Sequence, residues 1–411
     1  MTSAVNSSTA APGADGSLYW DPYDLEIDTA PYAIWRRMRD EAPLYRNDRY
    51  DFWALSRYAD VNSASRDPLV FSSAYGTVLE MMGTTKLAEL GTSMIIFMDP
   101  PEHDELRVLV SRAFTPRRVA RLEDQIRAIC AEHLDPMIGS GGFDYLADFG
   151  AQLPSKVISA LLGVPSSDRP HVLHLIDTVF HIEPGVGMIN DTALTAQLEL
   201  YEYLRGQIEH RRKSPTDDML TALVQVEVTQ DGATRKLTDD EAISFGLLLV
   251  SAGTETVARL LGWAAVVLDK HADQRAALTA DPAVIPNAIE ELLRFEAPSP
   301  VQGRTVTEEV ELHGTTLAPG SRVLLLTGSA GRDERVYEDP DRFDIHRRTD
   351  QHVTFGIGAH YCVGAALARL EGKVALEETL RRFPAWQVDQ ERAVRLHTST
   401  VRGYKSVPIT F

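Results

Sequence analysis

The stretch FGIGAHYCVGAALAR, residues 355–369, places a cysteine in a glycine-lined turn directly before a helix-forming sequence. Gly356 and Gly358 allow a tight turn and a close approach of the backbone to a flat object, because glycine has no β-carbon. Cys362 then lies at a helix N-terminus, where unpaired backbone N–H groups favour its thiolate. Since the chain has two cysteines and no His/Cys spacing suited to zinc, we expect one axial bond from this sulfur to a metal that another ligand set holds. An inert buried cysteine is the alternative, but it leaves His360 and Gly364 unexplained.

A second unusual segment lies in the middle of a long apolar helix expected over residues 238–270. The helix opens with Thr238 and Glu241, which form a capping box. Glycine and polar side chains at residues 253–256 cost stability in a buried helix. Hydroxyl side chains can bond backbone carbonyls and bend a helix, so we expect a local bend that leaves a groove for a small molecule or water. The alternative is a helix that merely kinks, with Glu255 paired to a distant arginine.

The elements that position these two segments are mainly helical. Apolar residues recur at helical spacing in residues 31–42, 103–114, 119–138, 193–211 and 361–382. Short strands are expected at residues 49–57, at residues 310–328 around a Pro319-Gly320 turn, and in the tail from residue 386 to 411. Strands and helices do not alternate as they would in a doubly wound fold. The pattern predicts a mainly α protein with small β-sheets.

Composition and charge exclude several classes of protein. No linker, repeat or composition break follows the first residues, so we expect a disordered tail over residues 1–20 and a single domain over residues 21–411. The tail lacks the basic start and apolar stretch of a secretion signal or membrane anchor, so a cytoplasmic location is expected. A formal charge of -18 argues against a nucleic-acid partner. The arginines of residues 107–118 are a local exception on which an acidic protein could dock, or simply a solvated helix face.

Residues 355–369 resemble the haem-binding signature of the cytochrome P-450 family at every fixed position, and four further segments resemble family motifs in the expected order. Glu291-Leu-Leu-Arg294 is similar to the Glu-x-x-Arg pair, and residues 339–343 resemble the segment before the cysteine loop. Residues 252–256 resemble the oxygen-binding motif. Residues 99–107 resemble the helix that binds the haem propionates. The resemblance covers most of the chain and implies the cytochrome P-450 fold.

The resemblance also implies roles for individual residues around haem b, which is iron protoporphyrin IX. Cys362 is the implied iron ligand. The other implied haem-binding residues are Ala252, Phe355, Gly356 and Gly364, together with the propionate-binding set His103, Arg107, Arg304 and His360. Glu255 and Thr256 are the implied catalytic pair, which relays protons to bound dioxygen. Glu291 and Arg294 are the implied structural pair.

The activity implied is that of a haem-thiolate monooxygenase, which inserts one atom of O2 into an apolar small molecule. Peroxide-using relatives tend to carry Arg-Pro in place of the acid and alcohol, so Glu255 and Thr256 disfavour a peroxygenase or isomerase and a non-catalytic haem-based sensor. Glu255 stands where many relatives have Asp, so proton delivery could differ in detail. The sequence contains no flavin or nicotinamide motif, so electrons are expected from a separate ferredoxin or flavodoxin with its reductase. Arg112, Arg117 and Arg118 are the expected docking residues for that partner.

The resemblance places the substrate pocket among several separate segments of the chain. These offer mostly apolar side chains, which imply an apolar substrate, and methionine supplies adaptable surface. The skeleton of that substrate stays open among terpenoid, steroid, fatty acid and aromatic compounds. The expected pocket residues are Val78, Leu79, Met81, Met82, Ile95, Val179, Phe180, Leu248 and Val301.

Overall fold

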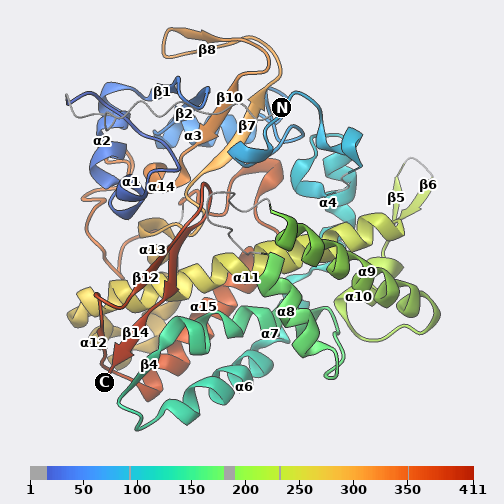
Figure 1. The fold of residues 1–411 in the computed structure, drawn as a ribbon, viewed down its shortest axis with the longest axis vertical. Helices are drawn as coiled ribbons and strands as arrows, with labels where there is room; N and C mark the ends of the chain where they lie inside the picture. The colour runs from blue at the N-terminus through green and yellow to red at the C-terminus, as the bar shows by residue number, and fades with distance from the viewer. Residues whose placement is uncertain (1–15, 92–93, 180–189, 231–232, 350) are drawn as a thin grey trace.

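Helices are the predominant regular elements of the computed structural model, which describes residues 16–91, 94–179, 190–230, 233–349 and 351–411 (Figure 1). The predicted mainly α fold is confirmed, although the helix expected over residues 119–138 is divided between two helices and the one expected from residue 361 begins at Ala365. The helices of the described residues are α1 Leu25–Thr29, α2 Tyr32–Glu41, α3 Tyr58–Arg66, α4 Glu102–Ala113, α5 Pro116–Ala120, α6 Glu123–Leu134, α7 Gln152–Leu161, α8 Arg169–Val179, α9 Asp191–Lys213, α10 Met219–Gln225, α11 Asp239–Lys270, α12 Ala272–Ala280, α13 Ile285–Phe295, α14 Thr327–Ala330 and α15 Ala365–Arg382.

Short strands gather into small sheets, as the turn-rich segments predict. The largest sheet has the order β1-β2-β10-β7-β3, in which only β10 and β2 run parallel. Its strands are β1 Leu44–Asn47, β2 Phe52–Leu55, β3 Phe71–Ser72, β7 Gln302–Val306 and β10 Arg322–Leu325. The others are β4 Gly142–Asp144 with β11 Gln387–Val388 and β14 Pro408–Thr410, and the hairpins β5 Glu227–Gln230 with β6 Ala233–Lys236, β8 Val310–Leu312 with β9 Thr315–Leu317, and β12 Val394–His397 with β13 Arg402–Ser406.

Helix α11 crosses the whole body of the protein, with α7, α8 and α15 packed against it (Figure 1). Its 32 residues extend over about 48 Å at 1.5 Å per residue. The predicted capping box is present, because Thr238 Oγ1 accepts from the Glu241 N–H and Glu241 Oε2 accepts from the Thr238 N–H. Within the described residues α11 is the one helix long and apolar enough to cross a membrane, and 61% of its apolar window is buried inside the protein. Its composition is therefore explained by the core that it forms.

The local bend expected at residues 253–256 stays a prediction, and α11 is one continuous helix from Asp239 to Lys270. The hydroxyl groups act as expected on the backbone: Thr254 Oγ1 donates to the Val250 carbonyl and Thr256 Oγ1 to the Ala252 carbonyl, each at 2.8 Å. Each hydroxyl makes its hydrogen bond to a carbonyl of α11 itself. The polar segment is therefore accommodated without unwinding the helix.

The folded body begins before residue 21, so the expected boundary of the tail at residue 20 is wrong. Trp20 is 2% exposed, and its ring meets the Phe52 ring edge-on at 5.8 Å. The Trp20 N–H also donates to Tyr45 Oη at 3.1 Å. Residues 1–15 of the expected tail lie outside the described residues.

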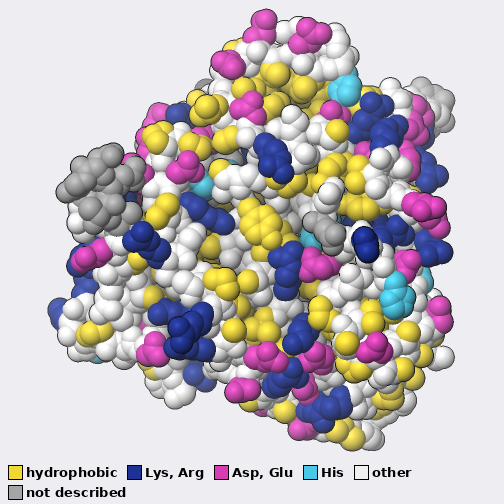
Figure 2. Space-filling view, turned by 180° about the vertical axis from the view of Figure 1, so that it is seen from behind, with side chains coloured by type: hydrophobic (Ala, Val, Ile, Leu, Met, Phe, Trp, Pro, Cys, Tyr) yellow, Lys and Arg dark blue, Asp and Glu magenta, His cyan; other side chains and the backbone are white. Residues whose placement is uncertain are grey.

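The face of the protein shown in Figure 2 carries both positive and negative side chains and has no continuous basic patch. Figure 2 shows Lys and Arg side chains in several groups with Asp and Glu between them. A nucleic-acid backbone would need a concentrated basic face on a chain whose formal charge is -18. This view contains no such face.

Candidate functional site

The cysteine loop, residues 355–364, is held in its turn by glycines and backbone hydrogen bonds. Gly356 and Gly358 have φ of 69° and 73°, in the left-handed region that favours glycine. A β-carbon on Gly358 would also lie 2.9 Å from the Ser65 carbonyl oxygen. The Cys362 N–H donates to the Phe355 carbonyl at 2.8 Å and closes the loop just before α15 begins at Ala365.

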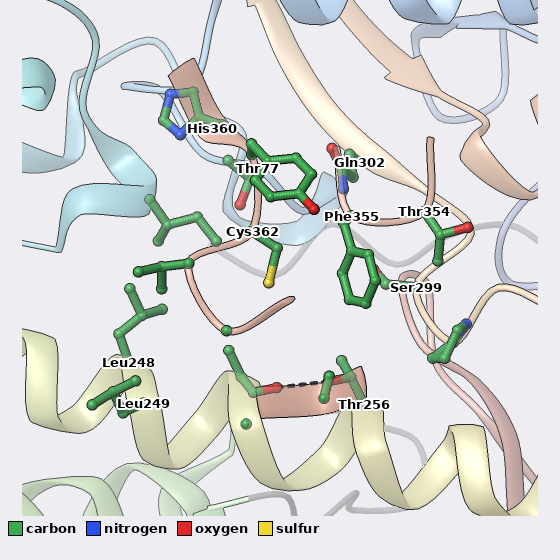
Figure 3. A pocket seen from close by; sticks show the side chains of 18 of the residues that line it. Thr77, Leu248, Leu249, Thr256, Ser299, Gln302, Thr354, Phe355, His360 and Cys362 are labelled. Carbon is green, nitrogen blue, oxygen red and sulfur yellow. Dashed lines mark hydrogen bonds between the residues drawn. The ribbon is translucent and has the colours of Figure 1, made fainter. Parts of the chain in front are cut away.

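The Cys362 sulfur points out of this loop into a cavity of about 330 Å³ that the loop shares with α11 (Figure 3). Burial raises the pKa of the Cys362 thiol, while the N–H groups of Gly364 and Ala365 and the charges of Arg107 and Arg369 oppose that rise. The N–H groups at the start of α15 thus favour the thiolate, as expected from the sequence, while burial opposes it more strongly. A cation beside the sulfur would be needed to hold the thiolate.

Helix α11 forms another wall of the cavity, which Ala252, Gly253 and Thr256 line, and Thr256 lies across the cavity from Cys362 (Figure 3). Glu255 does not line the cavity. Its carboxylate accepts from Arg259 Nε at 3.0 Å and Nη2 at 2.8 Å, one turn further along the same helix. The structure therefore brings Thr256 to the cavity and leaves Glu255 outside it. The alternative expected an ion pair between Glu255 and a distant arginine, and this is wrong in the partner, because Glu255 pairs with Arg259 four residues away.

One edge of the cavity carries a group of basic side chains, His103, Arg107, Arg304 and His360. The rings of His103 and His360 lie 4.3 Å apart. Burial lowers the pKa of His360 to about 3, and the neighbouring charge of Arg304 adds to this shift. His360 Nε2 is buried and has no hydrogen-bond partner among the described residues.

Arg304 is a buried cation without a carboxylate in hydrogen-bond contact. Its guanidinium donates to the Gly303 carbonyl at 2.7 Å, and burial lowers its pKa to about 10. His103 is 1% exposed, and its Nδ1 lies 2.9 Å from Asp104 Oδ1. Arg107 reaches the cysteine loop, because its Nη2 donates to the Tyr361 carbonyl at 2.6 Å. The expected set His103, Arg107, Arg304 and His360 therefore gathers at one edge of the cavity. Arg304 and His360 have unfilled hydrogen-bonding capacity among the described residues.

The pair Glu291 and Arg294 lies outside the cavity and joins α13 to the segment that leads to the cysteine loop. Both side chains are 0% exposed, and Arg294 donates to the two Glu291 oxygens at 2.7 and 2.8 Å. Arg294 Nη1 also donates to the carbonyls of Gly331 and Pro340 at 2.8 and 2.9 Å. Arg347 adds a second cation to Glu291 at 3.1 Å. The structural role expected for the pair agrees with these contacts.

The expected substrate pocket is only partly found. Val78, Ile95, Leu248 and Val301 line the cavity. Leu79, Met81 and Met82 do not line it: Leu79 and Met82 are buried in a separate apolar cluster with Trp35. Val179 packs against the main core and does not line the cavity either, and Phe180 lies outside the described residues.

The loop that carries Val78 is fixed by a close approach of two backbones. The Gly303 N–H on β7 donates to the Thr77 carbonyl at 2.7 Å. A β-carbon on Gly303 would lie 2.7 Å from Met82 Sδ and 3.0 Å from the Thr77 carbonyl carbon. Glycine at this position therefore allows the loop to rest directly on the strand that carries Arg304.

Several residues that line the cavity were not predicted from the sequence. Ile96 and Leu249 directly follow the predicted lining residues Ile95 and Leu248 in the sequence, and this adjacency was a signal for them. Thr77, Ser299, Gln302 and Thr400 add polar groups to an otherwise apolar wall. Glu371 of α15 also lines the cavity, and nothing in its sequence context distinguishes it from a charged residue on a helix surface.

Known proteins share this architecture along nearly the full chain. The family described as cytochrome P-450 matches residues 77–405. A protein named cytochrome P-450 123 of Mycobacterium tuberculosis is 42% identical over 397 residues, which are 96% of this chain and 98% of that protein. The structure of cytochrome P-450 CYP109Q5 from Chondromyces apiculatus has a TM-score of 0.86 at 34% identity and covers 95% of this chain and 97% of that chain. That of CYP109E1 from Bacillus megaterium, in complex with corticosterone, has a TM-score of 0.84 at 31% identity and covers 94% of this chain and 99% of that chain.

Proposed function

The chain belongs to the cytochrome P-450 family of haem-thiolate monooxygenases, and from this premise we propose that it inserts one oxygen atom of O2 into an apolar small molecule bound between the cysteine loop and α11. The observation that carries the proposal is the Cys362 sulfur aimed across the cavity at the α11 face of Ala252 and Thr256. Iron bound through this sulfur would supply the chemistry of O2, and thiolate donation favours cleavage of the oxygen–oxygen bond.

The residues around the cavity fit haem b. A porphyrin with two propionates needs a flat apolar space with cations at one edge. Arg304 and His360 are buried at that edge with unfilled hydrogen-bonding capacity, which two carboxylates would fill. His103 and Arg107 would complete the set of propionate partners. Gly364 keeps a side chain away from the sulfur, because a β-carbon there would lie 3.8 Å from Cys362 Sγ. At Gly356 a β-carbon would instead meet the His360 carbonyl oxygen at 3.3 Å. The Arg369 guanidinium lies over the Phe355 ring, 4.5 Å from its centre.

This chain's own residues exclude water and hold one hydroxyl in place. Leu248, Leu249 and Ile95 make the distal wall apolar, which disfavours bulk water beside the reacting group. Thr256 Oγ1 donates to the Ala252 carbonyl, so its lone pairs remain free to accept a proton from a donor in the cavity. We propose that this hydroxyl passes protons within the site.

The substrate is proposed to be apolar with a few polar substituents. The apolar lining supplies most of the contact area, and Thr77, Ser299, Gln302 and Thr400 supply hydrogen-bonding groups. Corticosterone, the ligand in one related structure, has this character and is a suitable first probe. Terpenoids, fatty acids and aromatic acids complete the panel.

The electron donor is proposed to be a ferredoxin or flavodoxin with its reductase, acting in the cytoplasm. Arg112 and Arg117 are exposed at the end of α4 and on α5, while Arg118 is partly buried and donates to the Asp218 carbonyl at 3.3 Å. Arg112 and Arg117 are thus the better placed of the expected docking residues. Helix α5 packs against α15, which follows the cysteine loop, and a basic pair at this place suits an acidic donor.

The test is the carbon monoxide difference spectrum of the reduced protein. We expect a thiolate-type Soret band in the wild type, its loss in Cys362→Ser, and its retention in the matched variant Cys130→Ser, since Cys130 is buried in α6. A band that survives Cys362→Ser would show that another residue holds the iron, and the proposal would fail. Spin-state shifts with the panel then identify the substrate class.

A further inference from the structure

Arg369 is a cation beside the cysteine loop to which the function described so far gives no role. Its guanidinium lies over the Phe355 ring, 4.5 Å from the ring centre, and its Nη1 donates to Tyr361 Oη at 3.0 Å. Tyr361 directly precedes Cys362 in the chain, and the Phe355 carbonyl accepts from the Cys362 N–H at 2.8 Å. Arg369 therefore contacts the two aromatic residues that adjoin Cys362.

Glu290 of α13 fixes the Arg369 guanidinium in this place. Its carboxylate accepts from Arg369 Nε at 2.6 Å and from Nη2 at 2.8 Å, and its Oε2 also lies 2.9 Å from His352 Nε2. Burial opposes the ionisation of Glu290, but the hydrogen bonds from His352 and Arg369 outweigh it and lower its pKa to about 2. Two parallel hydrogen bonds orient a planar guanidinium in a way that an ammonium group cannot be oriented. The cation is therefore held in one place against the Phe355 ring.

The path of the cysteine loop is set by contacts that do not involve the Arg369 side chain. The Tyr361 N–H donates to the Gly358 carbonyl at 3.1 Å. Thr354 Oγ1 donates to the Leu293 carbonyl of α13 at 2.8 Å and so fixes the start of the loop. With the bond that closes the loop at its cysteine, these contacts hold the backbone in place. Support of the loop is therefore an incomplete account of the guanidinium.

The charge of Arg369 favours the thiolate of Cys362. Burial raises the pKa of the Cys362 thiol, and the charges of Arg107 and Arg369 are among the groups that oppose this rise. Arg107 belongs to the set proposed to bind the haem propionates, whose negative charges would offset its own. Phe355 lines the cavity and Arg369 does not, so the Arg369 cation is one aromatic ring removed from the space for the cofactor.

Nearby acids leave much of this positive charge uncompensated. Glu371, two residues further along α15, is 0% exposed, and its carboxyl oxygens have no hydrogen-bond partner among the described residues. Burial raises its pKa well above the ordinary value, so Glu371 is neutral at neutral pH and adds no charge beside the loop. Glu290 shares its charge between Arg369 and His352, so it neutralises the guanidinium only in part.

We propose that Arg369 is a positioning residue that acts on the haem iron through Phe355 and Cys362 and limits electron donation by the thiolate, with Glu290 holding its guanidinium. The inference rests on the proposed function, because it needs iron bound through Cys362. A positive charge beside the thiolate draws electron density away from the metal and favours its reduced form. Arg369 therefore raises the reduction potential, which makes electron transfer from the ferredoxin or flavodoxin easier.

The first experiment measures the reduction potential of the haem-loaded protein by spectral titration without a redox partner, so a loss of docking cannot produce a shift. We expect Arg369→Gln to move the equilibrium toward the ferric form by about tenfold, which is about 59 mV for one electron. This is the size expected for a unit charge one aromatic ring away at an effective dielectric constant of about 20. Arg369→Lys keeps the charge and should recover part of the shift.

Two further variants control this measurement. Arg381→Gln removes an exposed cation from the same helix and should have the wild-type potential. The double variant Glu290→Gln/Arg369→Gln leaves no unpaired carboxylate, and its potential should still lie below that of the wild type. A double variant with the wild-type potential would show that the shift in Arg369→Gln came from the exposed charge of Glu290, and the inference would be overturned. An unchanged or higher potential in Arg369→Gln would overturn it as well.

The second readout is the C–O stretching frequency of the reduced carbon monoxide complex. Stronger donation from the sulfur increases electron donation from the iron to the ligand and weakens the C–O bond. The frequency should therefore fall in Arg369→Gln and in the double variant, and it should keep the wild-type value in Arg381→Gln. A frequency that stays constant or rises when Arg369 is removed would contradict a role in thiolate donation.

The carbon monoxide band separates failure of this inference from failure of the proposed function. A wild type without a thiolate-type band refutes the proposed function itself. A normal band in Arg369→Gln with an unchanged potential refutes only the role of Arg369. If Arg369→Gln loses the band, the double variant provides the comparison, because it leaves no unpaired charge. Loss of the band in both variants would identify Arg369 as a support of the loop and would overturn the inference.

Discussion

Replacement of Arg294 by alanine should strongly destabilise the protein, because it removes the centre of a buried ionic cluster. Arg294 makes four hydrogen bonds, two to Glu291 and one each to the carbonyls of Gly331 and Pro340. Breaking a buried ion pair by removing one partner costs about 3–5 kcal/mol. In the variant Glu291 would still contact Arg347 at 3.1 Å, which favours the lower end of this range of free energies. The carbonyls of Gly331 and Pro340 would lose their donor, which adds to the loss of stability. We therefore expect a loss of about 3–5 kcal/mol, a large part of the roughly 5–15 kcal/mol that stabilises a typical domain.

Urea unfolding of the haem-loaded protein, followed by tryptophan fluorescence and by the Soret band, measures this loss. Arg294→Lys should recover only part of it, because an ammonium cannot make the two parallel hydrogen bonds to Glu291. The matched control is Arg342→Ala, an exposed arginine in the segment that Arg294 supports, which should leave the midpoint unchanged. A loss for Arg294→Ala below about 1 kcal/mol, the value of an exposed pair, would refute the assignment of this cluster as the support of the cysteine loop.

Two further substitutions test the loop and the buried acid. Gly358→Ala should lower the stability of the protein by about 1–2 kcal/mol, because residue 358 has a left-handed backbone conformation. The contact of the new β-carbon with the Ser65 carbonyl should lower it further. Thermal release of haem should therefore begin at a lower temperature, and a release curve like that of the wild type would contradict the account of the turn. Glu371→Gln should stabilise the protein increasingly as pH rises above about 4.3, because the unfolded glutamate ionises there while the folded one, with its raised pKa, stays protonated until a higher pH. Urea midpoints of the two proteins across a pH series check this, and a constant difference would show that Glu371 ionises normally in the fold.

The sequence predicted best those features that depend on local chemistry. The capping box at Thr238, the turn at Gly356 and Gly358, and the helix after Cys362 follow from neighbouring residues, and the structure contains each of them. The pairing of Glu255 with Arg259 was also within reach, because the two residues are one helical turn apart.

The features that failed depend on packing between distant segments. Leu79 and Met82 have the apolar character of pocket residues, but the tertiary fold turns them toward Trp35 rather than toward the cavity. Glu371 was missed because a glutamate in a helical pattern ordinarily marks the solvent face, and its burial depends on the packing of α15 against α6, α11 and α13. The boundary of the tail was misplaced because the polar residues before Trp20 gave no sign of its burial against Tyr45 of β1 and Phe52 of β2.

The contact between Gly303 and the Thr77 loop limits how this protein can change its substrate range through evolution. Because the loop rests on β7 through a backbone hydrogen bond, its path is nearly independent of the side chains that it carries. Mutations at Val78 can alter the shape of the cavity without moving the loop, whereas any side chain at residue 303 would displace the loop and disturb Arg304 next to it. Evolution can therefore vary substrate-facing side chains such as Val78, while Gly303 keeps the loop and Arg304 in place.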